Sequence, residues 1–169
     1  MDKLNAAELF APQFNKNRTS MSNGLFVDLF IQQNRIQTAF DKVLNEISTK
    51  QMILLEMTAN CPDPKSLTRI GQLMGCSRQN VKQLADTLEK KGYLTMKKGG
   101  RRCVYLELTE KAKMYYTEMQ KTRDEFLDEL YSSLNDEELS QLYALRTKLF
   151  GSIDNAEEFA MEKLCEREK

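Results

Sequence analysis

Apolar residues recur at every third or fourth position along most of the chain, and this spacing is typical of one face of an α-helix. Phe26, Phe30 and the apolar positions that follow them continue the pattern as far as Ile47. We therefore expect one long amphipathic helix over about residues 22–47. A second helix is predicted after it, and it ends before the proline at position 62.

Polar residues that cap helices stand at the expected boundaries. Ser48 is followed three residues later by Gln51, which is the pattern of a capping box. Ser66 and Ser77 each precede a short amphipathic stretch, and a glycine suited to a left-handed turn stands between them at position 75. Two short helices around a tight turn are the layout of a helix-turn-helix.

A period of two replaces the helical period in one region. Val104, Leu106 and Leu108 alternate with more polar neighbours, and residues 93–98 form a second run before Gly99-Gly100. This arrangement predicts a β-hairpin closed by a Gly-Gly turn.

Helical periodicity resumes after the hairpin. Thr109 is the cap expected for a long helix, and Asn135 with Glu138 forms a second capping box. Gly151 interrupts the pattern before a last amphipathic helix over residues 155–166. The chain of 169 residues is therefore expected to be mainly helical, and its apolar fraction of 41% is enough to form a core.

The net charge of the chain is zero, but the charges are unevenly distributed. Between Lys65 and Arg102 there are ten basic residues and two acidic ones, so this segment carries a net charge of +8 and the remainder −8. The segment coincides with the predicted helix-turn-helix and hairpin. Such a cationic segment favours nucleic acid as a partner, and a solvated basic surface without function is the alternative.

The residue types present exclude several classes of chemistry. The chain has no histidine, and its four cysteines form no C-x-x-C pair, so zinc sites and histidine-based catalysis are poor hypotheses. Glycine motifs that bind phosphate are also missing, and we expect no enzyme, no metal and no cofactor. With no apolar run of eighteen residues and no signal-peptide pattern, we expect no membrane partner and a cytoplasmic protein with reduced cysteines.

The second helix of the predicted helix-turn-helix has one apolar side and one polar side. Val81, Leu84 and Leu88 fall on the apolar side at helical spacing. Arginine can read guanine, and asparagine or glutamine can read adenine, in a major groove that admits one helix. An ordinary exposed polar face is the alternative interpretation. The candidate base contacts are Arg78, Gln79, Asn80 and Gln83, and the candidate phosphate contacts are Lys82 and Lys90.

Four cations surround the two glycines at the tip of the predicted hairpin. They are Lys97, Lys98, Arg101 and Arg102. As a wing beside a recognition helix, the tip would place arginine at a minor groove, where narrow A·T-rich steps attract cations. A solvated hairpin without function is the alternative.

Four stretches of the chain resemble motifs of the MarR (multiple antibiotic resistance regulator) family of winged helix-turn-helix transcription factors. They are Ser48-Thr49-Lys50-Gln51, Gly75-Cys76-Ser77, Leu88-Glu89-Lys90-Lys91-Gly92 and Leu108-Thr109-Glu110-Lys111-Ala112. The resemblance covers roughly residues 21–153 and implies a winged helix-turn-helix fold that binds double-stranded DNA. Members of the family usually carry an Asp-x-Arg pattern on a longer wing. This chain has Gly100 at the aspartate position and Arg102 at the arginine position.

We expect the chain to divide into an N-terminal arm over 1–20, a MarR-type domain over 21–153 and a C-terminal helix over 154–169. Within the domain, the helix-turn-helix covers about 66–91 and the wing about 94–108. The resemblance implies that helices from both termini form a dimerisation region, and their apolar faces exceed what a small winged domain can cover. A monomer with these helices folded back is the alternative.

The resemblance also implies a pocket for a small aromatic or amphipathic effector. The candidate lining residues are Phe30, Met57, Tyr115, Tyr116 and Met119. Such residues more often belong to a core, which is the alternative here. The peroxide-sensing branch of the family uses a cysteine in the first helix, where this chain has none, so Cys76 and Cys103 are the thiols left for a redox response.

Together these features predict a dimeric, sequence-specific DNA-binding regulator, in particular a repressor on a pseudo-palindromic operator that a small effector releases. Two other functions stay open: a winged-helix scaffold for protein or RNA contacts, and a regulator that responds to oxidants through a thiol. The polar first turn of the recognition helix favours DNA reading, because a scaffold has no need of it.

Overall fold

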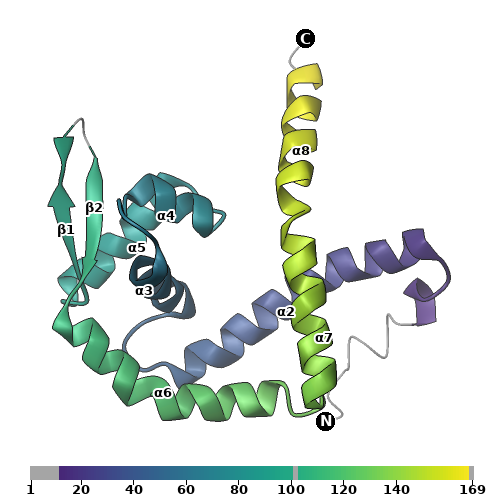
Figure 1. Ribbon diagram of the computed structural model, residues 1–169, viewed down its shortest axis with the longest axis horizontal. Helices are drawn as coiled ribbons and strands as arrows, with labels where there is room; N and C mark the ends of the chain where they lie inside the picture. Colours follow the sequence, from purple (N-terminus) through teal and green to yellow (C-terminus); the bar gives the residue numbers. More distant parts are fainter. Residues whose placement is uncertain (1–11, 101–102, 168–169) are drawn as a thin grey trace. The chain divides into compact units, whose positions relative to one another are not determined.

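The computed structural model describes residues 12–100 and 103–167 (Figure 1). Over these residues the chain is mainly helical with a two-stranded antiparallel sheet, as the sequence predicts. No helix among them is both long and apolar enough to span a membrane. The elements are α2 (Arg18–Val43), α3 (Thr49–Asn60), α4 (Leu67–Leu73), α5 (Arg78–Lys90), β1 (Leu94–Lys98), β2 (Val104–Leu108), α6 (Glu110–Leu130), α7 (Asp136–Phe150) and α8 (Ile153–Arg167).

The first long helix begins earlier than predicted. α2 starts at Arg18 rather than near residue 22, because Asn17 caps it and Ser20 completes a capping box. The predicted arm therefore passes into this helix before residue 20. Residues 1–11 of that arm lie outside the described residues.

α2 also ends earlier than predicted. Its last residue is Val43, since Leu44 adopts an extended conformation with ψ of 134°. The predicted end at Ile47 is therefore wrong. Leu44 and Ile47 lie in the loop that follows α2, and both side chains are buried in the core. Their apolar character therefore reflects burial from a loop and not a continued helix.

The described residues divide into two compact units in the middle of α6. One unit ends at Met119 and the other starts at Gln120. The first unit contains the helix-turn-helix and the hairpin, and the second contains the end of α6 with α7 and α8.

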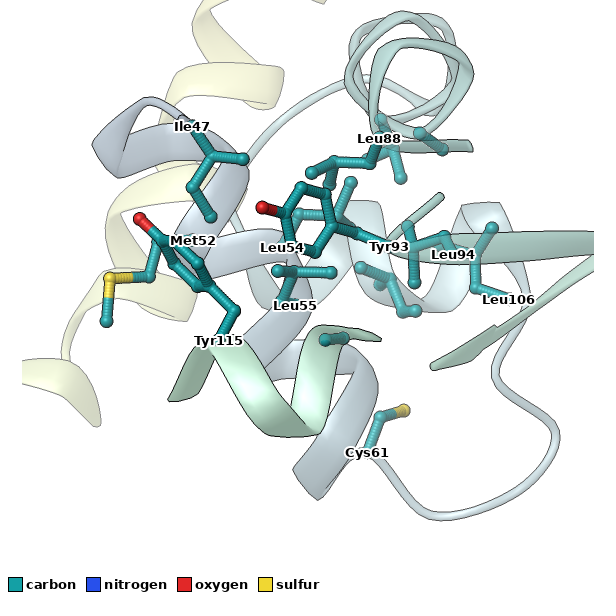
Figure 2. Close-up of a cluster of buried hydrophobic side chains, with 14 of the residues drawn as sticks. Ile47, Met52, Leu54, Leu55, Cys61, Leu88, Tyr93, Leu94, Leu106 and Tyr115 are labelled. Atoms are coloured by element: carbon teal, nitrogen blue, oxygen red, sulfur yellow. The ribbon is translucent and has the colours of Figure 1, made fainter. Parts of the chain in front are cut away.

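The core of the first unit draws on α3, α4, α5, the hairpin and the start of α6. Figure 2 shows its buried side chains, among them Leu54, Leu55 and Tyr93, which are completely buried. Complete burial of one leucine side chain contributes about 1.5–3 kcal/mol to stability. Leu88 of α5 and Leu94 of β1 belong to the same cluster, so one core holds both α5 and the hairpin.

The hairpin has the predicted strands but not the predicted turn. β1 and β2 pair antiparallel, and the pair nearest the tip is Lys98 opposite Val104. The Gly99 N–H donates to the Cys103 carbonyl at 2.8 Å, so Gly99 continues the pairing of the strands and the two glycines alone do not form the predicted Gly-Gly turn. Neither glycine of the tip has the positive φ that a two-residue turn requires. Gly99 instead provides space, because a Cβ there would lie 2.2 Å from the Tyr105 ring.

In the second unit, α7 and α8 expose a series of apolar side chains. Asn135 caps α7 and forms the predicted capping box with Glu138. Neither helix buries any of its residues. Exposed apolar surface on this scale is typical of interaction sites. The large apolar residues exposed on these helices are Leu139, Leu142, Tyr143, Leu145, Leu149, Phe150, Ile153, Phe159, Met161 and Leu164.

Candidate nucleic-acid interface

The turn between α4 and α5 is fixed by two glycines and a cap. The Cys76 N–H donates to the Gly71 carbonyl at 2.9 Å, and a Cβ on Gly71 would lie 2.7 Å from the Cys76 carbonyl oxygen. Gly75 has a φ of +63°, a conformation that favours glycine. The Ser77 hydroxyl then accepts from the Asn80 N–H at 3.2 Å. The predicted turn and cap are confirmed, and they determine where α5 begins.

α5 has a buried apolar side and an exposed polar side. Val81, Ala85 and Leu88 are completely buried, whereas Leu84, which was predicted on the apolar side, is only half-buried. Because the core holds the apolar side, the opposite side of the helix is left on the surface. The six candidate DNA contacts of α5 are all exposed: Arg78, Gln79, Asn80, Lys82, Gln83 and Lys90.

The two acidic residues of α5 make specific contacts. Asp86 lies 2.6 Å from the Lys82 ammonium, one helical turn away. Such an exposed pair contributes only about 0.3–0.5 kcal/mol, so a phosphate can replace Asp86 as the partner of Lys82. Glu89 accepts from the Met96 N–H at 2.7 Å and thereby joins α5 to β1.

The hairpin lies next to α5 and carries the remaining candidate contacts (Figure 1). The Lys97 ammonium lies 2.7 Å from the carboxylate of Glu107 on the neighbouring strand. Lys98 is exposed near the tip. Arg101 and Arg102 lie outside the described residues, so their contacts stay a prediction.

The five candidate effector-pocket residues lie in different environments. Tyr115 and Met119 are buried in the core, Phe30 is exposed on α2, and Met57 and Tyr116 are partly buried against the core. A surface hollow of about 580 Å³ includes Tyr116 and none of the other four. The hollow is lined by Ala59, Lys65, Glu107, Leu108, Lys113 and Tyr116.

Tyr115 has an unusual hydroxyl group. This hydroxyl is buried and has no hydrogen-bond partner among the described residues. Burial and, to a lesser degree, the charge of Glu46 raise the pKa of Tyr115, so the group remains a proton donor at neutral pH. A buried donor without an acceptor lowers stability by about 1–3 kcal/mol.

The sequence does not predict the cluster of charged residues at the C-terminal end of α5. Glu46, in the loop after α2, contacts Lys91, Tyr93 and Lys111. These partners are 45 to 65 positions away from Glu46. No helical or strand periodicity connects residues so distant, and in the sequence Glu46 and the two lysines look like ordinary surface positions.

Within the described residues, no group of three or more His, Cys, Asp or Glu side chains is arranged to hold a metal ion. The four cysteines form no disulfide. Cys76 is half-buried in the turn before α5, and Cys103 is exposed at the wing. A thiol-based response at either residue stays a prediction.

Comparison with known proteins identifies the family. No protein-family model matches the sequence. The chain is, however, 30% identical over 128 residues to the transcriptional repressor MprA of Escherichia coli, and the match covers 75% of this chain and 72% of MprA. The protein belongs to the MarR family of transcriptional regulators. It is therefore a regulator and not an enzyme.

Solved structures confirm the MarR fold. The S. aureus MepR–DNA complex superimposes with a TM-score of 0.65 at 22% identity, covering 75% of this chain and 97% of MepR. A MarR/EmrR family regulator from Acinetobacter sp. ADP1 has a TM-score of 0.65 at 20% identity, over 82% and 99% of the two chains. BpsR of Bordetella bronchiseptica, whose DNA binding is regulated by 6-hydroxynicotinic acid, has a TM-score of 0.64 at 18% identity, over 74% and 98%.

Proposed function

We propose that this MarR-family regulator is a homodimeric repressor that binds a pseudo-palindromic operator through α5 and the hairpin wing. The observation that carries the proposal is the polar side of α5, where a capped turn and a buried apolar side present six candidate contacts to the surface. Two relatives support it: MprA is a transcriptional repressor, and MepR has been solved bound to DNA.

The exposed residues of α5 divide by chemistry into two roles. Arg78, Gln79 and Asn80 stand in the first turn, the part of a recognition helix that meets base edges, and Gln83 follows one turn later. Their planar donor and acceptor groups suit guanine and adenine in the major groove. Ammonium and guanidinium groups are suited to phosphates and to the minor groove. The residues that carry them are Lys82 and Lys90 of α5 and Lys97, Lys98, Arg101 and Arg102 of the wing.

The homodimer is supported by apolar surface that the chain itself leaves uncovered. α2 buries none of its residues, and α7 and α8 likewise bury none. A second copy of the chain would cover these faces and bring two recognition helices into twofold symmetry, which requires half-sites about one helical turn apart. On α2 the large exposed apolar residues are Met21, Leu25, Phe26, Val27, Leu29 and Phe30.

A small effector is the second part of the proposal. Within the described part of the chain the Tyr115 hydroxyl is a buried donor without a partner, and a ligand with a carboxylate or phenolate oxygen would supply the acceptor. BpsR offers a precedent, because a small aromatic acid regulates its DNA binding. The expected result is release of operator by such a ligand in the wild type and weaker release in Tyr115→Phe.

Selection of bound sequences from a random duplex library tests the operator-binding function. The selected site should be pseudo-palindromic, and affinity for it should fall by roughly 10³–10⁵ between 50 and 200 mM salt if 6 to 10 phosphates are contacted. Enrichment of no sequence, or binding that salt does not weaken, would leave the scaffold function as the better account.

A further inference from the structure

The loop between α2 and α3 packs against the C-terminal end of the recognition helix. Leu44 and Ile47 fix this loop by inserting their side chains into the core. Glu46 stands between them with half of its side chain exposed. Its position is therefore set by the two buried neighbours rather than by its own contacts.

Three residues from the α5–β1 junction and from α6 meet at Glu46. The Tyr93 hydroxyl donates to Glu46 Oε2, and the Lys111 ammonium lies 3.4 Å from the same oxygen. The Lys91 ammonium donates to the Glu46 backbone carbonyl. Lys91 is the C-cap of α5, and Tyr93 directly precedes β1. One loop residue thus contacts the point where the recognition helix passes into the wing.

The junction is held by further directional contacts. The Lys111 ammonium donates to the Lys91 carbonyl at 3.1 Å and lies 4.3 Å from the centre of the Tyr93 ring. The Thr109 hydroxyl donates to the Gly92 carbonyl at 2.7 Å. The Tyr93 ring is completely buried, so a hydrogen bond at its hydroxyl fixes the junction relative to the loop.

Charge assists the bond between Tyr93 and Glu46. Burial and the Glu46 carboxylate raise the pKa of Tyr93, while the Tyr93 hydroxyl and the Lys111 ammonium lower the pKa of Glu46. At neutral pH the tyrosine is therefore a donor and the carboxylate a charged acceptor. Hydrogen bonds of this kind are stronger and shorter than neutral ones.

We propose that Glu46 is a positioning residue for DNA binding, which fixes the direction of α5 and the wing relative to the end of α2 without contacting DNA itself. The inference rests on the proposed DNA-binding function. The apolar contacts of α5 hold the helix on the core and decide which side is exposed, but they are non-directional. The bonds at Glu46 are directional, and they connect the recognition helix to the chain that leads back to α2.

Two explanations of Glu46 predict opposite effects of Glu46→Gln. If Glu46 were only a negative charge near a DNA-binding surface, its removal would tighten binding to every duplex, since one repulsion with phosphates is lost. If Glu46 positions α5, the same change should weaken binding to the selected operator by about 2- to 10-fold, the effect of losing part of one hydrogen bond. Affinity for a scrambled duplex should stay equal or rise.

The experiment compares affinities for operator and scrambled duplex in the full chain, at one salt concentration. Tyr93→Phe removes only the hydroxyl and should lower the ratio of the two affinities as Glu46→Gln does, without changing the charge. The double variant should lose no more than the larger single loss, because both changes break one bond. Glu118→Gln is the matched control, since Glu118 is an exposed carboxylate on α6 whose charge also reaches Tyr93.

A reduced ratio in both Glu46→Gln and Tyr93→Phe, with Glu118→Gln unchanged, supports the positioning role. Equal tightening on both duplexes in Glu46→Gln, or an unchanged ratio in Tyr93→Phe, overturns it. Tyr93→Phe keeps the buried ring, so it provides the answer even where Glu46→Gln unfolds. Failure of the DNA-binding function itself would appear first in the wild type, as equal affinity for both duplexes.

Discussion

Single side chains determine how the helices of this regulator meet, and Asp41 near the end of α2 is an example. Its carboxylate accepts from the Thr49 N–H at 2.6 Å and from the Thr49 hydroxyl at 2.7 Å, so it joins α2 to the first turn of α3. The hydroxyl bond and then the backbone bond lower the pKa of Asp41 below its ordinary value of 3.8.

This lowered pKa makes the contribution of Asp41 depend on pH. A carboxylate with a lowered folded-state pKa stabilises the fold above its unfolded-state pKa, and this stabilisation is lost as the pH falls through the folded-state value. The free energy of unfolding should therefore be higher in the wild type than in Asp41→Asn at neutral pH. The difference should shrink below about pH 4, and urea unfolding from neutral to acid pH measures it.

Asp128→Asn, an exposed change on α6, is the control for this measurement. A difference between the wild type and Asp41→Asn that stays constant down to about pH 3 would show that the Thr49 bonds do not depend on the charge of Asp41.

Lys98 at the wing tests the distinction between holding DNA and reading it. A lysine that contacts phosphate should weaken binding to all duplexes nearly equally when it is changed to alanine, and the salt slope should fall by about one unit. Binding titrations of Lys98→Ala over a range of salt concentrations measure both. Lys121→Ala removes the same charge from α6 and should leave the slope unchanged. A change in sequence preference in Lys98→Ala would assign this residue to base reading instead.

At the scale of elements, the geometry of the helix-turn-helix depends on Gly71. Alanine in place of glycine inside a helix normally gains about 0.5–1 kcal/mol. Here the added Cβ would meet the Cys76 carbonyl oxygen at 2.7 Å, and overpacking of this kind costs about 1–3 kcal/mol. Gly71→Ala should therefore lower both the thermal midpoint and operator affinity.

Gly100→Ala is the matched change, because a Cβ at Gly100 meets nothing within 4 Å. It should leave the thermal midpoint almost unchanged. Stabilisation by Gly71→Ala would show that the turn between α4 and α5 relaxes without strain.

Elements were predictable from the sequence where their ends depend on neighbouring residues. The caps at Ser48, Ser77 and Asn135 are local, because each cap bonds to a residue three positions ahead, and all three are confirmed. The end of α2 was not predictable from apolar spacing, because Leu44 and Ile47 are buried from a loop and not from a helix. The spacing of apolar residues reports which side chains are buried, and side chains are buried from loops as well as from helices.

The candidate site shows the same division. The exposed side of α5 follows from helical spacing, which the sequence displays directly. The contacts of Glu46 depend on how three distant segments pack, and no pattern in a single sequence reports such packing. The conformation near the tip of the wing was not predictable either, because it depends on the Tyr105 ring, which occupies the space beside Gly99.

At the scale of the whole molecule, the exposed apolar faces predict a dimer. The wild type should sediment as a dimer at micromolar concentration. Leu145→Glu places a charge on an apolar position of α7 that is 66% exposed, and it should shift the protein towards monomer and weaken operator binding. Ser140→Glu adds the same charge at an exposed polar position of α7 and should not. A wild type that sediments as a monomer would rule out the dimer.

The central claim is that the first turn of α5 reads bases, and the sequence preference of Gln79→Ala tests it most directly. Affinities for the selected operator and for its single-base variants should be measured for the wild type, for Gln79→Ala and for Gln120→Ala, which truncates an exposed glutamine on α6. Gln79→Ala should lose about 1–3 kcal/mol on the operator and lose discrimination at one base pair in each half-site, while Gln120→Ala behaves as the wild type. If Gln79→Ala keeps the affinity and the full sequence preference of the wild type, the assignment of base reading to this turn is contradicted.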